Sequence, residues 1–198
     1  MKRAIAAACL AVCAALWASA AGAQGLKLGL NISDFEGDDA GDWDTKLGFS
    51  VGAFMVRGLG HGLDLQTELL YTTKGAKVSG TFMGQDYETV VELAYLELPL
   101  LLRVSSRTAS GKLGLLVGPF VGLNVSADST TTVAGHSDTT SIEDDTTDLE
   151  AGLVFALAFE GRGVSGELRY TLGLTTIDED GDTDVTNTVL SMMVGFTF

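Results

Sequence analysis

The stretch TVLSMMVGFTF, residues 188–198, alternates between two kinds of side chain. Large apolar residues occupy every second position, namely Leu190, Met192, Val194, Phe196 and Phe198. Because successive side chains of a β-strand point to opposite faces, this pattern predicts a strand with one wholly apolar face. That face needs either lipid or a protein core against it, and the rest of the sequence decides between the two.

Alternation with a period of two recurs along the chain, and each segment ends in Gly, Asp, Thr or Ser. The predicted strands cover 25–33, 46–57, 62–74, 89–105, 112–127, 148–161, 164–176 and 188–198. Long connections follow every odd-numbered strand, at 34–45, 75–88, 128–147 and 177–187. An up-and-down meander of these strands has its long loops at one end, as transmembrane barrels do. An even strand number also lets the first and last strands pair and leaves no open edge.

A soluble eight-stranded barrel alternates too, with its apolar side chains inside, so alternation alone leaves both folds open. The opposite face of the predicted strands decides. In 112–127 this face carries Gly114, Gly118 and Gly122, which suit the crowded interior of a narrow barrel and make a poor water-facing surface. The sequence therefore predicts an all-β fold, an eight-stranded antiparallel up-and-down transmembrane β-barrel with aliphatic side chains toward lipid.

The N-terminal segment is predicted to be an export signal. A basic start, an apolar run over 4–18 and the small-residue pattern at 21–23 predict a cleaved signal peptide covering 1–23, and a cut after Ala20 is an alternative. The barrel domain then covers 24–198.

Composition argues against nucleic-acid binding and against disulfide bonds. Removing Lys2 and Arg3 from the 12 basic residues leaves 10 against 26 acidic residues, so the mature net charge is −16. Nucleic acid is excluded because binding of its phosphates needs a basic surface. Both cysteines, Cys9 and Cys13, lie in the predicted signal peptide, so no disulfide is expected.

Several short blocks resemble the PorT-like family of outer-membrane β-barrels, a group of porin-family proteins. They are LGLNIS (28–33), ELLYTTKG (68–75), YLELPLLLR (95–103), Gly118-Pro119 and ELRY (167–170), and YLELP is the most specific of them. The resemblance covers essentially the whole mature chain, and a last strand ending on Phe is typical of outer-membrane barrels. It implies an eight-stranded barrel in the outer membrane of a Gram-negative bacterium, and it brings no catalytic residues.

Charged residues on the face opposite the apolar one are predicted to point into the lumen. They are Asp64, Glu68, Glu97, Arg103, Glu150, Glu167 and Arg169, accompanied by Gln66 and Glu160. Charges removed from water are tolerated when they are paired, so one interpretation is a salt-bridged plug. The alternative is a gated path lined by the same groups. Eight strands leave an interior just wide enough for side chains, which favours the plug.

The long loops are acidic and rich in Thr and Ser. Asp178, Asp180, Asp182 and Asp184 superficially suit weak binding of a divalent ion, because hard cations prefer carboxylate oxygens. Their Gly is misplaced relative to an EF-hand loop, which favours a solvated loop. We predict no metal centre and no cofactor, and we expect such carboxylates to reach lipopolysaccharide phosphates through bridging cations.

The two histidines offer little for catalysis. His61 lies in a predicted turn and His136 in a predicted loop at the other end, so they cannot share a metal. His136, Ser137 and Asp138 have the residue types of a hydrolase triad, but consecutive residues do not converge easily. We predict a non-enzymatic, monomeric outer-membrane protein with a structural or surface-interaction role through its external loops, whose partners are outer-membrane lipid, lipopolysaccharide and an unknown extracellular ligand. A small porin-like channel and a lipid-modifying enzyme are the alternatives.

Overall fold

The computed structural model describes residues 22–37, 43–82, 84–133, 135–142, 146–177 and 185–198. Over these residues the chain forms antiparallel strands β1 (Ala23–Glu36), β2 (Asp44–Gly60), β3 (Leu63–Phe82), β4 (Gln85–Arg107), β5 (Lys112–Val133), β6 (His136–Ser141), β7 (Leu149–Gly161), β8 (Val164–Gly173) and β9 (Thr186–Thr197). Within the same residues, no helix has the length and apolar character needed to cross a membrane.

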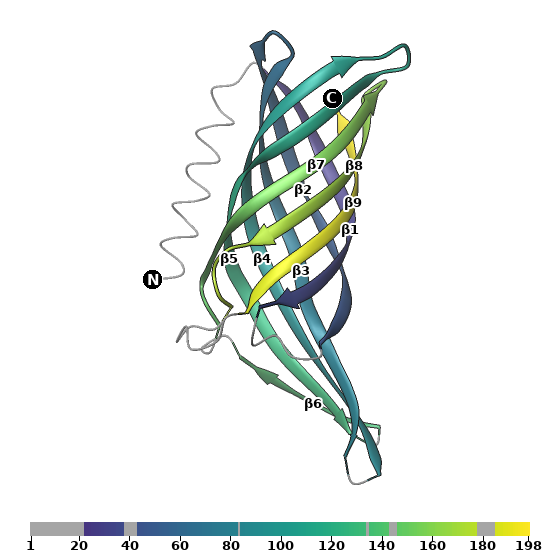
Figure 1. Cartoon of the computed structure of the whole chain (residues 1–198), viewed down its shortest axis with the longest axis vertical. Helices are drawn as coiled ribbons and strands as arrows, with labels where there is room; N and C mark the ends of the chain where they lie inside the picture. Colours follow the sequence, from purple (N-terminus) through teal and green to yellow (C-terminus); the bar gives the residue numbers. More distant parts are fainter. Residues whose placement is uncertain (1–21, 38–42, 83, 134, 143–145, 178–184) are drawn as a thin grey trace.

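Eight of the strands close into a ring, shown in Figure 1. The hydrogen-bonded order runs β4-β3-β2-β1-β9-β8-β7-β5, and pairing between β4 and β5 joins its two ends. The first and last strands pair from Gly25↔Thr197 to Glu36↔Thr186. The predicted eight-stranded antiparallel barrel is therefore confirmed.

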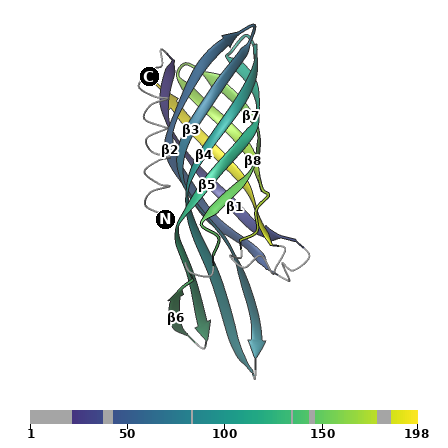
Figure 2. The ribbon, with the colours of Figure 1, turned by 90° about the vertical axis from the view of Figure 1, so that its left-hand side faces the viewer.

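The two ends of the barrel differ, as Figures 1 and 2 show. We call the end with the β2–β3, β4–β5 and β7–β8 turns the turn end, and the opposite end the loop end. His61 and Arg162 occupy the left-handed region, with φ of 56° and 53°, and each is followed by a glycine with positive φ. This pair of residues forms the tight hairpin turns whose twist matches that of the flanking strands.

Two hairpins extend beyond the barrel at the loop end, and they correct the prediction of loops at 75–88 and 128–147. β3 and β4 stay paired as far as Phe82↔Gln85, and β6 is a ninth strand paired with β5. We call residues 76–82, 85–91, 128–133 and 136–141 the projection (Figure 2). Its Thr and Val residues favour strands, and hydroxyl contacts such as Thr130···Thr139 at 3.0 Å join neighbouring strands.

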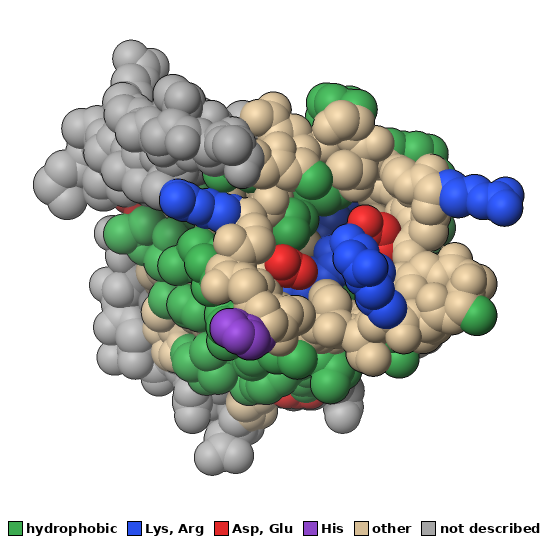
Figure 3. Space-filling model, turned by 90° about the horizontal axis from the view of Figure 1, so that it is seen from above, with side chains coloured by type: hydrophobic (Ala, Val, Ile, Leu, Met, Phe, Trp, Pro, Cys, Tyr) green, Lys and Arg blue, Asp and Glu red, His purple; other side chains and the backbone are tan. Residues whose placement is uncertain are grey.

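The barrel wall has opposite chemistry on its two faces. Outward-pointing Leu30, Leu47 and Met192 are 72%, 75% and 70% exposed, whereas inward-pointing Lys27 and Glu68 are 2% and 1% exposed. Seen from the turn end, apolar side chains cover much of the outer wall, acidic and basic side chains gather at the centre of the ring, and further basic side chains project from its rim (Figure 3). A continuous apolar exterior with a polar interior is the pattern of a barrel surrounded by lipid.

Candidate functional site in the barrel lumen

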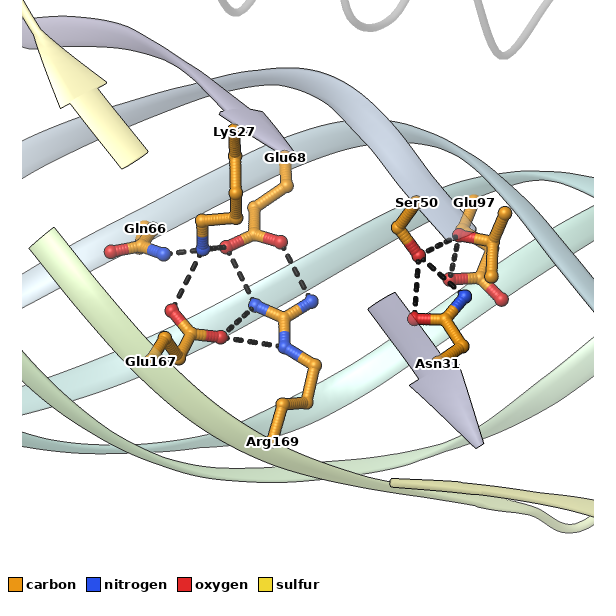
Figure 4. A network of polar contacts seen from close by, with 9 residues as sticks. Lys27, Asn31, Ser50, Gln66, Glu68, Glu97, Glu167 and Arg169 are labelled. Carbon is orange, nitrogen blue, oxygen red and sulfur yellow. Dashed lines mark hydrogen bonds and ion pairs between the residues drawn. The ribbon is translucent and has the colours of Figure 1, made fainter. Parts of the chain in front are cut away.

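One group of buried charged and polar side chains, the turn-side cluster, consists of Lys27, Gln66, Glu68, Glu167 and Arg169 (Figure 4). Lys27 Nζ lies 2.7 Å from Glu68 Oε1 and 2.8 Å from Glu167 Oε2. Arg169 makes a second pair of contacts, 2.8 Å to Glu68 Oε2 and 2.6 Å to Glu167 Oε1. Two cations thus face two carboxylates, and the cluster is neutral. Paired and hydrogen-bonded charges of this kind are the ones tolerated away from water.

A glycine on β2 allows this cluster to form across three strands. Lys27 of β1 is the cross-strand partner of Gly52, and Glu68 belongs to β3 on the far side of β2. A Cβ at Gly52 would lie 2.0 Å from the Leu69 carbonyl oxygen, so only glycine fits there. Because Gly52 has no side chain, the ammonium of Lys27 reaches over β2 to the Glu68 carboxylate.

A second group, the loop-side cluster, consists of Lys74, Glu97, Glu150 and Asn187. Lys74 Nζ lies 2.6 Å from Glu97 Oε1 and 2.8 Å from Glu150 Oε2, and Asn187 Nδ2 donates to Glu150 Oε1 at 3.3 Å. The ammonium is also 5.0 Å from the ring centroids of both Tyr95 and Phe120, which adds cation–π attraction. Here one cation serves two carboxylates.

Hydroxyl and amide groups lie between the two clusters, alongside buried apolar side chains. Asn31 donates to Ser50 Oγ at 2.9 Å, Ser50 to Thr72 Oγ1 at 3.1 Å and Thr72 to Glu97 Oε2 at 3.2 Å (Figure 4). A cavity of about 10 Å³, bordered by Thr72, Glu97 and Arg169, remains at this level. Its size allows at most about one water molecule.

Both ends of the lumen hold further side chains. At the loop end, an apolar cap forms where Phe35, Ile142 and Ile177 pack against buried Leu93 and Tyr95. The residues of this cap lie on strands and connections far apart in sequence, and Tyr95 also contacts Lys74, so the cap adjoins the loop-side cluster.

At the turn end, a smaller charged group lines the mouth of the lumen. Arg103 Nη2 lies 2.8 Å from Glu160 Oε2, and Lys112 Nζ is 3.8 Å from the other oxygen of Glu160. Asp64 is the cross-strand partner of Arg103 and is only half-buried.

The structure thus divides the seven predicted lumen residues among three groups. Glu68, Glu167 and Arg169 meet in the turn-side cluster, Glu97 and Glu150 in the loop-side cluster, and Arg103 and Asp64 at the turn-end mouth. The prediction omitted Lys27 and Lys74, the lysines at the centres of the two clusters. Their position in the inward register of their strands was the signal that could have identified them.

Other predicted features lie elsewhere. Asp178, Asp180, Asp182 and Asp184 and residues 1–21 of the predicted signal peptide are outside the described residues. His61 is in the β2–β3 turn, and His136 begins β6 at the other end of the molecule. All residues of β6 are exposed, and strand geometry directs Ser137 to the face opposite His136 and Asp138. Among the described residues, no three His, Cys, Asp or Glu side chains gather as a metal site.

A closed β-barrel with an apolar exterior and a charged interior defines an outer-membrane protein. The chain matches the family described as outer membrane protein beta-barrel domain over residues 22–179, and it belongs to that family. The protein is therefore a β-barrel of the bacterial outer membrane. No curated protein shows significant similarity to its sequence.

Several solved structures are similar to this chain. Neisserial surface protein A has a TM-score of 0.49 at 12% identity, covering 88% of this chain and 97% of that one. The attachment invasion locus protein Ail of Yersinia pestis has a TM-score of 0.42 at 11% identity, covering 89% and 99%. OprG of Pseudomonas aeruginosa has a TM-score of 0.40 at 14% identity, covering 90% and 96%.

Proposed function

We propose that this protein is a closed, non-catalytic, monomeric outer-membrane barrel that displays an acidic loop end outside the cell and acts through that surface. Within its family, the blocks YLELP (95–99) and ELRY (167–170) favour a PorT-like member. The observation that carries the proposal is the filled lumen, in which two ion-paired clusters leave a cavity of about 10 Å³ between them.

Opening a path through this lumen would require separating buried ion pairs. Glu68 and Glu167 are each held by both Lys27 and Arg169, so no single side-chain movement clears the ring. Removing one partner of a buried pair costs about 3–5 kcal/mol, because the remaining charge is left in a medium of low dielectric. A plug is therefore favoured over a conducting path.

The loop end supplies the surface for interaction. Of the 26 acidic residues, 20 lie in 34–46, 86–92, 128–148 and 178–184, and Lys46 is the one basic residue in these segments. Lys46 is already bound to Glu92 at 2.9 Å. Such a surface repels phosphate groups directly, so contact with lipopolysaccharide requires bridging divalent cations, and an unidentified extracellular ligand is expected to be cationic.

Conductance in planar bilayers tests the closed lumen. We expect the wild-type protein to remain at the baseline over many insertions, with insertion itself verified by the shift in gel mobility between unheated and heated samples. Discrete conductance steps from the folded protein would refute the plug and support the channel alternative.

Calorimetry tests the role of the loop end. We expect calcium to promote binding of the folded protein to lipopolysaccharide, and a variant in which the exposed carboxylates of the projection become amides, Asp86→Asn with Glu88→Gln and Asp138→Asn, to bind more weakly. Equal calcium-dependent binding by both proteins would exclude a role for the projection. For the enzymatic alternative, His136→Ala is expected to leave the lipid A profile of the producing cells unchanged.

A further inference from the structure

The turn end carries a group of exposed cations in addition to those buried in the lumen. They are Arg57, Arg107, Lys112 and Arg162, and Lys112 also borders the charged group at the mouth of the lumen. Within the described part of the chain, no carboxylate lies within ion-pair distance of Arg57, Arg107 or Arg162. This end of the barrel therefore has the opposite charge to the loop end.

Two of these cations are direct neighbours. Arg107, the last residue of β4, is paired in register with Lys112, the first residue of β5. Like charges directly opposite one another destabilise an antiparallel pair. The nearest carboxylate, that of Glu160, is 3.8 Å from Lys112 and is already held by Arg103 at 2.8 Å. An anion bound between the cations would relieve this repulsion.

The same strands form an apolar groove on the outer wall. Its volume is about 720 Å³, and its lining includes Val104, Leu115, Leu157 and Leu168 on β4, β5, β7 and β8. These four residues are successive cross-strand partners, so they form one row across the wall. The lining faces lipid and is almost wholly apolar.

The groove and the cations lie along the same strands. Arg107 and Lys112 each stand three residues from a groove residue, Val104 and Leu115, which is about 10 Å along a strand. Arg162 is at the tip of the turn between β7 and β8, which form the other side of the groove. Arg107 and Lys112 belong to the inward register, but the wall ends at these residues and leaves both exposed.

We propose that this region binds an anionic phospholipid of the periplasm-facing leaflet. An acyl chain occupies the groove, and the phosphate lies among Arg107, Lys112 and Arg162. Anionic lipid is favoured over zwitterionic lipid because the three cations have one carboxylate, Glu160, within ion-pair distance among the described residues. This site does not depend on what the loop end binds.

Native mass spectrometry of the folded protein tests the proposal, with phosphatidylglycerol and phosphatidylcholine of identical acyl chains as probes. We expect tighter binding of phosphatidylglycerol, and Arg107→Gln and Arg162→Gln are each expected to weaken it about fivefold, the effect of one basic residue at a lipid surface. Arg57→Gln is the matched control, because it removes the same charge at the same end on β2, away from the groove. That variant is expected to bind like the wild type.

Two further measurements separate a lipid site from a phosphate site. Leu157→Trp, which fills the groove, is expected to weaken binding of the long-chain lipid, and millimolar inorganic phosphate is expected not to displace it. Equal binding of the two lipids, or equal losses from Arg57→Gln and Arg107→Gln, would overturn the proposal. Displacement by inorganic phosphate would overturn the role of the groove.

Discussion

Replacing Arg169 with Met tests whether the turn-side cluster is held by its charge balance. The guanidinium contacts Glu68 and Glu167 at 2.8 Å and 2.6 Å, and Arg169 is 3% exposed. In Arg169→Met, Lys27 alone would serve two carboxylates that are 1% and 6% exposed. We expect the free energy of unfolding to fall by about 3–5 kcal/mol, the usual cost of leaving a buried charge without its partner. Urea unfolding in lipid vesicles, followed by circular dichroism, measures this change.

A second variant separates charge balance from packing. Arg169→Met combined with Glu167→Gln leaves Lys27 and Glu68, which are 2.7 Å apart, as a neutral pair. This double variant is expected to recover most of the lost stability, because replacing a buried ion pair with uncharged groups is often nearly neutral. A loss below about 1 kcal/mol for the single variant, within the range of ordinary substitutions, would refute the reasoning. So would a double variant less stable than the single one.

Three further predictions concern other parts of the barrel. Lys74→Met is expected to cost about 3–5 kcal/mol in urea unfolding, because two buried carboxylates lose their shared cation. Gly118→Ala is expected to lower the free energy of unfolding by about 2 kcal/mol or more, since its Cβ would lie 2.0 Å from the Leu100 carbonyl oxygen. Gly166→Ala is the control, because its Cβ would meet nothing within 4 Å, and it is expected to change the free energy of unfolding by less than about 0.5 kcal/mol. Replacing 130–139 with a two-residue turn is expected to leave the barrel folded, as judged by gel mobility, because these residues extend beyond the ring; loss of the folded band would contradict this.

The barrel could be predicted from sequence because a bilayer imposes a period of two on every strand. Outward positions such as Leu190 and Met192 are 45% and 70% exposed, as the alternation required. The prediction failed where that requirement ends. At 128–133 both faces of the strand carry Asp, Ser or Thr, and at 76–82 the apolar register is weakened by Ala76 and Gly80, while the hydrogen-bonded ladder continues in both segments. Thr and Ser were therefore interpreted as signs of a loop.

The partners within the lumen could be predicted only in part. Alternation placed Glu68 and Glu167 on the inward face, but the distance between strands in the ring depends on closure and register. Lys27 and Glu167 are 140 residues apart in sequence and meet because β1 and β8 both border β9. A shift of one residue in any strand pairing would exchange the inward and outward faces. Periodicity therefore identified most of the carboxylates that face the lumen, but it did not predict which cation pairs with each of them.

The arrangement of the cations relates the charges of the lumen to those of the two ends of the barrel. Of the 10 basic residues beyond the predicted signal peptide, Lys27, Lys74, Arg103 and Arg169 are buried in the lumen. The other six divide unequally, with Lys46 and Lys77 toward the loop end and four at the turn end. Four of the ten basic residues thus pair with carboxylates inside the barrel, and only two lie toward the loop end, which is therefore strongly acidic. If the lumen is closed, as we propose, the two ends are the surfaces left for partners, and their opposite charges favour different partners on the two sides of the membrane.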